Sequence, residues 1–262
     1  MNAALSYLPS VDTANEVLLV SDGRYVARLA NSADEIEAAL RLRHRVFNVE
    51  LGGHPEIDDL EQDAFDLVCR HLIVVDRVTG QIVGTYRLNS VESAVDTKGF
   101  YSFGEFSIED LPADVLARGV EVGRACISAA HRNTKVLYLL WRALARFLQI
   151  YNKRYMFGCC SIFSRDPLVG ERAFHQLAKA GHFHDRLRVE PRRNALYLGP
   201  VEEIEREPVE LPSLFNMFLR IGAKVCGPPI IDDDFGTIDF FVVFDREAMT
   251  EKCRKTFFDD IG

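Results

Sequence analysis

Two charged residues lie within a stretch that otherwise has the composition of a buried strand. The stretch VEVGRACISAAHR, residues 120–132, supplies apolar and small residues but carries Glu121 and Arg124. A carboxylate inside a partly dry strand has a raised pKa, so it can accept a proton near neutral pH. We therefore expect Glu121 to act as a general base, directly or through a water molecule, with Arg124 as its catalytic companion.

The geometry of a strand limits how Arg124 can reach its partners. Three residues after Glu121, it falls on the opposite face of an ideal strand. A bulge near Gly123 would bring the two side chains together, and bulges are common beside active sites. Otherwise Arg124 reaches a different partner, for which Asp63 and Asp66 are candidates, and clamps an acidic loop over the site.

Further charged residues are candidates for binding substrate. They could complete a network with Arg124 or hold a carboxylate in a guanidinium fork, and they are Arg45, Asp63, Asp66 and Arg87. An alternative is that such a network is purely structural. Residues 50–66 hold seven acids and no lysine or arginine, which indicates a solvated loop or a surface that attracts a cation. Asp232, Asp233, Asp234 and Asp239 are a second candidate for attracting a cation.

Several short motifs are interpreted as coincidental. The HxxxxD spacing occurs in residues 54–59 and 71–76, but the first lies in a glycine- and proline-containing loop and the second spans an apolar strand. HFHD at residues 182–185 offers two histidines without a clear third ligand, so no metal site is predicted. Cys159 and Cys160 lie in an apolar strand with no histidine near in sequence, which favours buried structural thiols.

Composition narrows the class of protein. The chain has 262 residues, 48% of them hydrophobic, and a net charge of −8, which argues against a broad nucleic-acid-binding face. No early stretch has the pattern of a signal peptide, and no window is apolar enough to span a bilayer. The six cysteines include no CxxC pair, so we expect a reduced, cytoplasmic protein.

Hydrophobic periodicity predicts an α/β (α+β) chain with helices on both faces of a central sheet. The expected strands are residues 24–30, 70–76, 81–88, 120–130, 154–163 and 237–245, and the expected helices are residues 32–50, 133–152, 168–181 and 212–221. We expect residues 1–20 to be a loose lead-in, residues 21–245 a single domain, and residues 246–262 a tail or helix.

The order of elements resembles the GNAT superfamily of N-acyltransferases. This resemblance implies a mixed, twisted sheet whose two central strands, residues 120–130 and 155–163, splay apart to admit the pantetheine arm of a thioester donor. The loop SAAHRNTKV contains no glycine, and none occurs between Gly123 and Gly158. Since such a loop provides poorly for a pyrophosphate, acyl carrier protein is expected as donor rather than coenzyme A.

Several motifs resemble a narrower group within this superfamily. LRHRVFNVELG, DAFDLVCRHLIVVD, IVGTYRL, YSFGEF and EVGRACI are similar to ornithine N-acyltransferases and long-chain N-acyl amino acid synthases, which are related to acyl-homoserine-lactone synthases. The likeness runs from about residue 41 to residue 180, and YSFGEF adds Phe103 to the substrate-binding candidates. The lactone synthases usually carry a tryptophan after the first helix, whereas Trp141, the one tryptophan here, lies in the long helix.

The resemblance implies transfer of a long-chain, or 3-hydroxy, acyl group from acyl carrier protein to the α-amine of ornithine, giving a lyso-ornithine lipid. No permanently bound cofactor is implied, because acyl-phosphopantetheine is a substrate. The alternatives are another amino-acid acceptor, an acyl-homoserine-lactone-type synthase, or a non-catalytic module that binds acyl chains or carrier protein. The sequence leaves open the chain length, the acceptor and the oligomeric state.

Basic residues are the candidates for docking an acidic carrier protein. The first set is Arg142, Arg146, Lys153 and Arg154, and the second is Arg186, Arg188, Arg192 and Arg193. The alternative for each set is an ordinary solvated face. The product would be amphiphilic, so contact with the inner face of a membrane is one interpretation of Phe215, Met217 and Phe218. The alternative is that these residues belong to a core helix.

Overall fold

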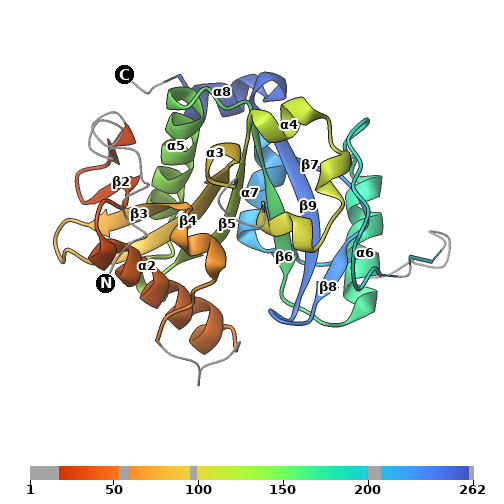
Figure 1. The fold of residues 1–262 in the computed structure, drawn as a ribbon, viewed down its shortest axis with the longest axis horizontal. Coiled ribbons are helices and arrows are strands. Elements are labelled where there is room, and N and C mark those ends of the chain that lie inside the picture. The colour runs from red at the N-terminus through yellow and green to blue at the C-terminus, as the bar shows by residue number, and fades with distance from the viewer. Residues whose placement is uncertain (1–17, 53–58, 95–98, 197, 200–207, 260–262) are drawn as a thin grey trace. The chain divides into compact units, whose positions relative to one another are not determined.

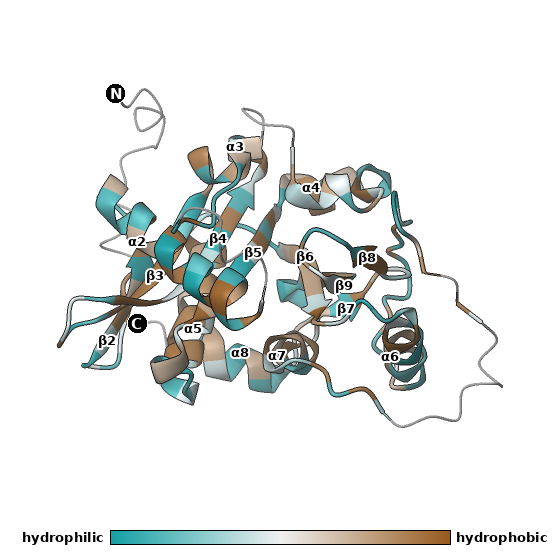
Figure 2. Cartoon of the chain, turned by 90° about the horizontal axis from the view of Figure 1, so that it is seen from below, coloured by the Kyte–Doolittle hydropathy of each residue, from teal (hydrophilic) through white to brown (hydrophobic). Residues whose placement is uncertain are grey.

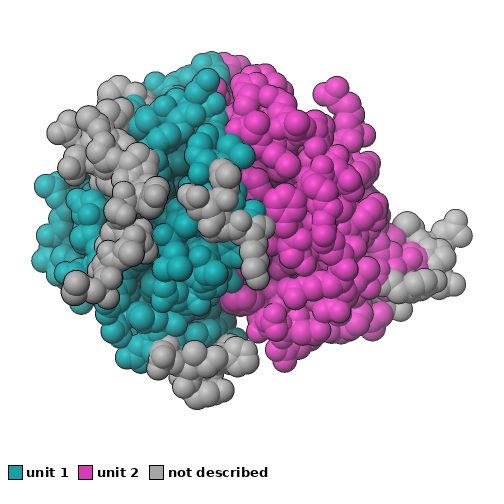
Figure 3. Space-filling model, in the orientation of Figure 1, with its two compact units in different colours: residues 1–99, 120–153, 254–262 teal, residues 100–119, 154–253 magenta. Residues whose placement is uncertain are grey.

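The chain forms two compact units that are interleaved along the sequence (Figure 3). The structure is a computed structural model that describes residues 18–52, 59–94, 99–196, 198–199 and 208–259. Unit 1 comprises residues 1–99, 120–153 and 254–262, and unit 2 comprises residues 100–119 and 154–253. The predicted domain at residues 21–245 therefore contains two compact units. Most of the predicted lead-in, residues 1–17, lies outside the described residues.

The described strands of unit 1 form an antiparallel sheet in the order β1-β2-β3-β4-β5 (Figure 1). They are β1 (Val20–Ser21), β2 (Tyr25–Leu29), β3 (Arg70–Asp76), β4 (Ile82–Ser90) and β5 (Gly119–Ile127). The hairpin predicted from RHLIVVD and QIVGTYRL is confirmed as β3 and β4. Strand β5 matches the stretch that carries Glu121 and Arg124, and it pairs with β4.

Two helices cover opposite faces of this sheet, as the alternation of side chains along β3 requires. They are α2 (Ala33–Arg43) and α5 (Thr134–Ile150). On one face Ile73 packs in a cluster with Ala39 of α2. On the other face the next residue, Val74, lies beside Gly84, where a Cβ atom would stand 3.3 Å from Val136 of α5. Gly84 therefore lets α5 lie close against the sheet.

Capping side chains begin both helices where the sequence predicts. Ser32 accepts a hydrogen bond from the Glu35 backbone N–H, and Asn133 accepts from the N–H groups of Lys135 and Val136. After α2 the chain continues as a π-helical segment, His44–Glu50, which is rare and is often associated with function. A short helix, α3 (Val91–Ala94), follows β4.

The C-terminal helix α8 (Glu251–Phe257) completes the outer side of α5. The Phe257 ring lies 5.5 Å from that of Tyr138 and 6.3 Å from that of Trp141. The Tyr138 hydroxyl donates a 3.0 Å hydrogen bond to the Thr256 carbonyl. The predicted tail at residues 246–262 thus includes an ordered helix whose end packs on unit 1.

Unit 2 is built around β9, which pairs antiparallel with each of the three other described strands of the unit (Figure 1). The strands are β6 (Tyr155–Ile162), β7 (Lys224–Val225), β8 (Ile230–Asp232) and β9 (Thr237–Asp245). The helices are α4 (Ala113–Ala117), α6 (Pro167–Lys179) and α7 (Ser213–Ile221), with 3-10 turns η4 (Tyr101–Gly104) and η5 (Ile108–Asp110).

Alternate residues of β9 face different layers of unit 2. Phe240 packs on Phe215 of α7, at 5.6 Å between ring centroids. Phe241, on the opposite face, packs on Phe106 and Phe157 at 5.8 and 5.9 Å. The face of Phe241 is also the face of Asp239, two residues earlier. The segment that contains η4 and η5 is therefore packed over the Asp239 side of the sheet.

Helix α7 has an apolar side, which Figure 2 shows in brown. Phe215 and Phe218 are 1% and 3% exposed, so they belong to the core, as one of the two sequence interpretations holds. Met217 is half-buried. Among the described residues, no helix has both the length and the apolar character needed to cross a bilayer.

Candidate active site

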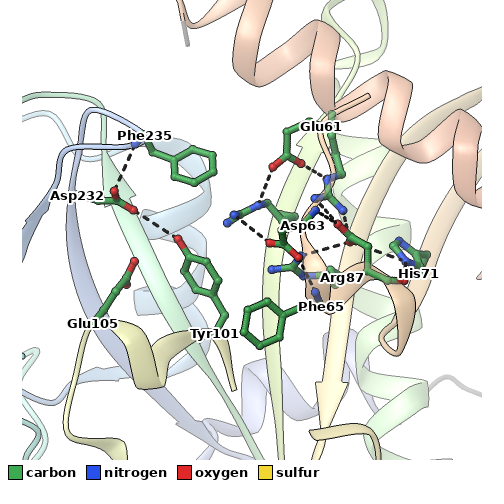
Figure 4. A network of polar contacts seen from close by, with 12 residues as sticks. Glu61, Asp63, Phe65, His71, Arg87, Tyr101, Glu105, Asp232 and Phe235 are labelled. Atoms are coloured by element: carbon green, nitrogen blue, oxygen red, sulfur yellow. Dashed lines mark hydrogen bonds and ion pairs between the residues drawn. The ribbon is translucent and has the colours of Figure 1, made fainter. Parts of the chain in front are cut away.

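Asp66 is the centre of a buried ion-pair network in unit 1, of which Figure 4 labels Glu61, Asp63 and Arg87. Arg43, at the end of α2, donates to its two carboxylate oxygens at 2.6 and 3.1 Å, a bidentate fork. Arg87 of β4 donates to it at 3.2 Å. Burial opposes ionisation of Asp66, but the attraction of Arg43 and Arg87 outweighs it and holds the pKa of this carboxyl well below its ordinary value.

The acidic loop supplies two further carboxylates. Asp63 accepts from Arg87 at 2.6 Å and from Arg124 at 3.3 Å. Glu61 accepts from Arg124 at 3.0 Å and also pairs with Arg43. Three guanidinium groups therefore alternate with three carboxylates, and their formal charges cancel.

A capping box fixes the loop that carries these acids. Asp63 begins the 3-10 turn η3 (Ala64–Leu67) by accepting the Phe65 backbone N–H at 2.8 Å. Asp66 in turn accepts the Asp63 backbone N–H at 2.9 Å. Each carboxylate therefore holds both the local turn and a distant arginine, so the loop is fastened to α2, β4 and β5.

Arg124 reaches the network through a β-bulge. Thr85 pairs with Cys126 and Arg87 pairs with Gly123, so two residues of β5 oppose the single residue Tyr86 of β4. Arg124 has a φ of 49°, in the left-handed region that a non-glycine residue seldom adopts. A bulge therefore lies beside Gly123, and the Arg124 side chain contacts Asp63, which was the alternative to pairing with Glu121.

Glu121 lies on β5 opposite Asn89 of β4, and it is 6% exposed. Because Arg87 and Asn89 are two residues apart on β4, Glu121 shares a face of the sheet with Arg87. Burial raises the pKa of the Cys69 thiol to about 12. The positive charge of Arg87 opposes this rise, and the negative charge of Glu121 adds to it. The structure thus places the predicted base within the sheet, on the side of the ion-pair network.

Two other substrate-binding candidates lie elsewhere. Arg45 is exposed on the π-helical segment, whereas Arg43, two residues earlier, is 1% exposed and joins the network. Phe103 belongs to unit 2, where its ring stacks on Phe100 at 6.0 Å. Arg43 and Glu61 were missed as network members. Arg43 had a signal, since it follows Leu40 at helical spacing, but Glu61 did not stand out within the acidic run.

The candidate residues for carrier-protein docking differ in whether their charges are already paired with carboxylates of this chain. Lys153 is buried, with its ammonium 2.9 and 3.0 Å from the Glu92 carboxylate. Arg154 forms a bidentate pair with Asp245 at 2.8 and 2.7 Å, which raises its pKa further. Arg142 and Arg146 are half-buried on α5. The alternative set, Arg186, Arg188, Arg192 and Arg193, is exposed.

The histidine motifs take structural roles. His71 and Asp76 stand at the two ends of β3, where the His71 ring lies 3.3 Å from the Asp66 carbonyl and Asp76 accepts from Arg24 at 2.8 Å. The other HxxxxD match includes His54, which lies outside the described residues. In HFHD, the His184 ring nitrogen accepts the Leu187 backbone N–H at 3.0 Å, which forms a loop.

Unit 2 contains a second cluster of buried acids that the sequence indicated only in part. Asp232 and Asp239 are buried, while Asp233 and Asp234 are exposed. Glu105, which follows η4, joins the buried pair and is 1% exposed. Burial, with the neighbouring charges of Asp239 and Asp232, raises the pKa of Glu105 to about 8.

Cys159 lies against this cluster. Its thiol donates a 2.9 Å hydrogen bond to Glu105, and burial raises the pKa of the thiol well above its ordinary value. Such a thiol is a poor nucleophile, which agrees with the structural role predicted for it. One ligand atom from each of Glu105, Cys159 and Asp239 lies within 4.8 Å of the other two, so this donor set could also receive a metal ion.

We expect Glu105 to lower the stability of the protein as pH rises. An unfolded chain ionises a glutamate near about pH 4.3, whereas native Glu105 keeps its proton up to about pH 8, so the native state binds more protons in between. The free energy of unfolding should then fall by about 1.4 kcal/mol per pH unit relative to Glu105→Gln, which cannot ionise. Urea unfolding of both proteins across this range measures the difference, and parallel pH profiles would contradict it.

The family is established by the relatives of the chain. The acetyltransferase (GNAT) domain family matches residues 42–142. An L-ornithine N(alpha)-acyltransferase of Brucella abortus is 34% identical over 251 residues, which cover 90% of this chain and 89% of that protein. A protein of the same name from Rhodobacter capsulatus is 32% identical, over 88% of this chain and 93% of its own length.

Crystal structures support the same fold. The acyl-homoserine-lactone synthase LasI superposes with a TM-score of 0.51 at 13% identity, over 90% of this chain and 96% of its own. TofI, in a ternary complex with an inhibitor and MTA, gives 0.51 at 18% identity, over 88% of this chain and 96% of its own. At these identities the likeness concerns the fold alone. Together with the sequence relatives, it places the chain in the L-ornithine N(alpha)-acyltransferase family of GNAT-fold acyltransferases.

Proposed function

We propose that this acyltransferase moves a long-chain or 3-hydroxy acyl group from acyl carrier protein to the α-amine of L-ornithine, giving a lyso-ornithine lipid. The observation that carries the acceptor is the shared name of four relatives, which are 32–35% identical over 82–90% of this chain. The reaction is cytoplasmic in this proposal, where the amino acid and the carrier protein meet, with contact at the inner face of the membrane where the amphiphilic product is released.

Glu121 is the general base of the proposed reaction. The neutral amine attacks the thioester carbonyl, a C–N bond forms, and the C–S bond breaks to release the phosphopantetheine thiol. Glu121 takes the proton that the amine loses, and the same proton then passes to the departing thiolate, so that Glu121 ends the cycle ionised. The burial of Glu121 within β5 supports this role, because a carboxylate there is shielded from bulk water.

The ion-pair network gives the base a rigid surrounding. Arg87 of β4 pairs with Gly123 of β5, and Arg124 follows Gly123 on β5. Both arginines donate hydrogen bonds to the Asp63 carboxylate. Since Asp63 also caps η3, the loop and the sheet are fixed together. Arg45, Phe103 and the network residues stay as candidates for contacting the acceptor or the acyl chain, and Arg142, Arg146, Lys153 and Arg154 stay as candidates for carrier-protein docking.

The start of α5 supports acyl carrier protein as donor. A pyrophosphate is often held by free backbone N–H groups at a helix N-terminus. Here the Asn133 side chain already accepts from Lys135 and Val136, at 3.0 and 3.1 Å. The preceding loop has no glycine, so close approach of the backbone to a diphosphate is not favoured.

We expect kcat/KM with acyl carrier protein to exceed that with the matching acyl-coenzyme A by about tenfold or more, which corresponds to about 1.4 kcal/mol. Steady-state rates with the same C16 chain on both carriers measure the ratio. Replacing Asn133 with alanine should narrow the ratio, because it frees two N–H groups for a phosphate. A preference for coenzyme A in the native protein would contradict the donor assignment.

The function as a whole is tested by offering the purified protein C16-charged carrier protein and a panel of single amino acids. Mass spectrometry then identifies each acyl amide. Formation of Nα-acylornithine at a rate well above the other products is the expected result. An acylated product from another amino acid would replace ornithine as acceptor, and no product with any acceptor would favour a non-catalytic binding module.

A further inference from the structure

Asn89 of β4 carries a buried acceptor that is unused within the part of the chain that the structure describes. The residue is 2% exposed. Its amide nitrogen donates a 3.2 Å hydrogen bond to the Gly99 carbonyl. Its amide oxygen, Oδ1, is buried and has no hydrogen-bond partner among the described residues. Buried acceptors in this state are few in a native protein, so each one calls for an explanation.

The contact with Gly99 fixes which branch of the Asn89 amide is the oxygen. Exchanging the nitrogen and the oxygen would set two acceptors against each other, Oδ1 and the Gly99 carbonyl, at 3.2 Å. An asparagine amide has an oxygen that only accepts and a nitrogen that only donates. The group missing beside Asn89 Oδ1 is therefore a hydrogen-bond donor.

Asn89 stands directly opposite Glu121 in the β4–β5 ladder. Residues paired in this way have Cβ atoms about 4.5–5.5 Å apart, so the two side chains are neighbours on one face of the sheet. Arg87, two residues before Asn89, lies on the same face and is paired with Gly123. The unused acceptor thus belongs to the same patch of sheet as the proposed base, and all four residues lie in unit 1.

The backbone at Gly123 leaves space beside these side chains. A Cβ atom at Gly123 would meet no described atom within 4 Å. Gly84 gives the contrast, because a Cβ atom there would lie 3.3 Å from Val136 of α5. Strand residues two apart face the same side, so the space over Gly123 adjoins Glu121. This face of the sheet therefore has room for a small polar group beside Glu121 and Asn89.

The groups around this space suit an amine. A carboxylate and a neutral amide oxygen both accept hydrogen bonds, so they attract N–H groups and repel the oxygens of a carboxylate or a phosphate. Arg87, the guanidinium on the same face, already donates to Asp63 and Asp66 at 2.6 and 3.2 Å. The chemistry beside Glu121 is thus that of an acceptor pair, which matches a nucleophile with more than one N–H group.

We infer that Asn89 Oδ1 accepts a hydrogen bond from the α-amine of the acceptor amino acid and orients it for attack. This inference rests on the proposed function, in which that amine attacks the thioester. A neutral primary amine has two N–H groups and one lone pair. The lone pair forms the C–N bond, one proton passes to Glu121, and the other N–H, which remains in the amide product, donates to Asn89. Two fixed acceptors therefore set the direction of the lone pair.

The test compares two acceptors that differ in one N–H group. Nα-methylornithine is a secondary amine, so once its proton passes to Glu121 it has no N–H left for Asn89. For Asn89→Ala we expect kcat/KM to fall about 30-fold with ornithine and to stay within about threefold with Nα-methylornithine. The matched control is Asn31→Ala, which removes an exposed amide from unit 1 and should change neither value.

The outcomes separate this inference from the function on which it rests. Acylation of an amino acid by the native protein decides the function by itself. If the amino acid is not ornithine, that amino acid and its Nα-methyl form replace the ornithine pair. Equal losses with both acceptors would show that Asn89 only holds Gly99 and would overturn the inference, as would native activity with ornithine in folded Asn89→Ala. If Asn89→Ala does not fold, judged by circular dichroism, Asn89→Ser is measured with the same expected selectivity.

Inhibition replaces turnover if the native protein acylates Nα-methylornithine too slowly to measure. The quantity compared is then the inhibition constant of Nα-methylornithine divided by KM for ornithine. We expect this ratio to be about tenfold lower in Asn89→Ala than in the native protein, because the variant no longer distinguishes the two amines. An unchanged ratio, or no inhibition of a variant that still acylates ornithine, would overturn the role of Asn89.

Discussion

Replacing Glu121 with glutamine is expected to lower kcat by about 10³-fold, because the amide cannot accept the proton of the attacking amine. KM for ornithine should change little, since glutamine keeps the shape of the side chain. The remaining activity should rise with pH as the acceptor α-amine, with an ordinary pKa of about 8, loses its proton without help. Single-turnover rates with excess enzyme over a pH series measure both effects.

The control for this experiment is Glu37→Gln. Glu37 lies on α2 with about half of its side chain exposed, and it pairs with Arg41 on the surface. Its replacement removes a carboxylate from unit 1 without touching the sheet, so activity should be unchanged. Wild-type kcat in a folded Glu121→Gln protein would remove Glu121 from the mechanism.

The largest expected effect on stability comes from Arg43. Its replacement with methionine keeps much of the side-chain volume but leaves Asp66 and Glu61 buried without their principal cation. Breaking a buried pair by removing one partner typically costs about 3–5 kcal/mol, because an uncompensated charge remains. Urea or thermal unfolding of Arg43→Met should therefore show a loss of this order in the free energy of unfolding.

Arg41 provides a matched control two residues earlier in the same helix. It pairs with Glu37 and Asp59 at the surface, where solvent screens the interaction, so Arg41→Met should leave stability almost unchanged. The double variant Arg43→Met/Asp66→Asn should lose less free energy of unfolding than the two single variants added together. In the double variant neither partner of this pair is left buried with an unpaired charge. Equal stabilities of the Arg41 and Arg43 variants would show that the network contributes nothing to folding.

The sequence predicted the elements better than it predicted the contacts between them. Strands β2 to β6 and β9, and helices α2, α5, α6 and α7, follow from hydrophobic periodicity and capping residues, which are local properties. The π-helical segment after α2 did not, because residues 32–50 show one continuous helical pattern. A π-helix differs from an α-helix in its backbone hydrogen bonds, which composition does not report.

Four of the charged residues chosen from the sequence come together in the structure, whereas the arginine chosen near the end of the first helix does not join them. Asp63, Asp66, Arg87 and Arg124 meet as expected. Arg45 was chosen from LRLRHRVF, whereas the structure uses Arg43, because which side of α2 is buried depends on the loop that folds over it. That loop is 18 residues or more away in sequence, so the pairing had no local signal.

Glu105 illustrates the same limit in unit 2. The motif YSFGEF drew attention to Phe103, but the burial of Glu105 arises from the packing of η4 and η5 over β9, residues far along the chain. A bulge near Gly123 was expected as one way to bring Arg124 to the side of Glu121. It falls on Arg124 because the register of β4 against β5 sets its position.

The interleaving of the two units has a consequence for how the protein is made. Unit 1 contains residues from both ends of the described chain, and its helix α5 is covered by Phe257 and neighbouring residues. A ribosome adds about 5–20 residues per second, so roughly 5–20 s pass between the emergence of α5 and that of Phe257. During that time the side of α5 that carries Trp141 lacks its contact with Phe257. A chaperone that binds this apolar surface would protect the nascent chain. The N-terminal half is therefore unsuited to expression as a separate fragment.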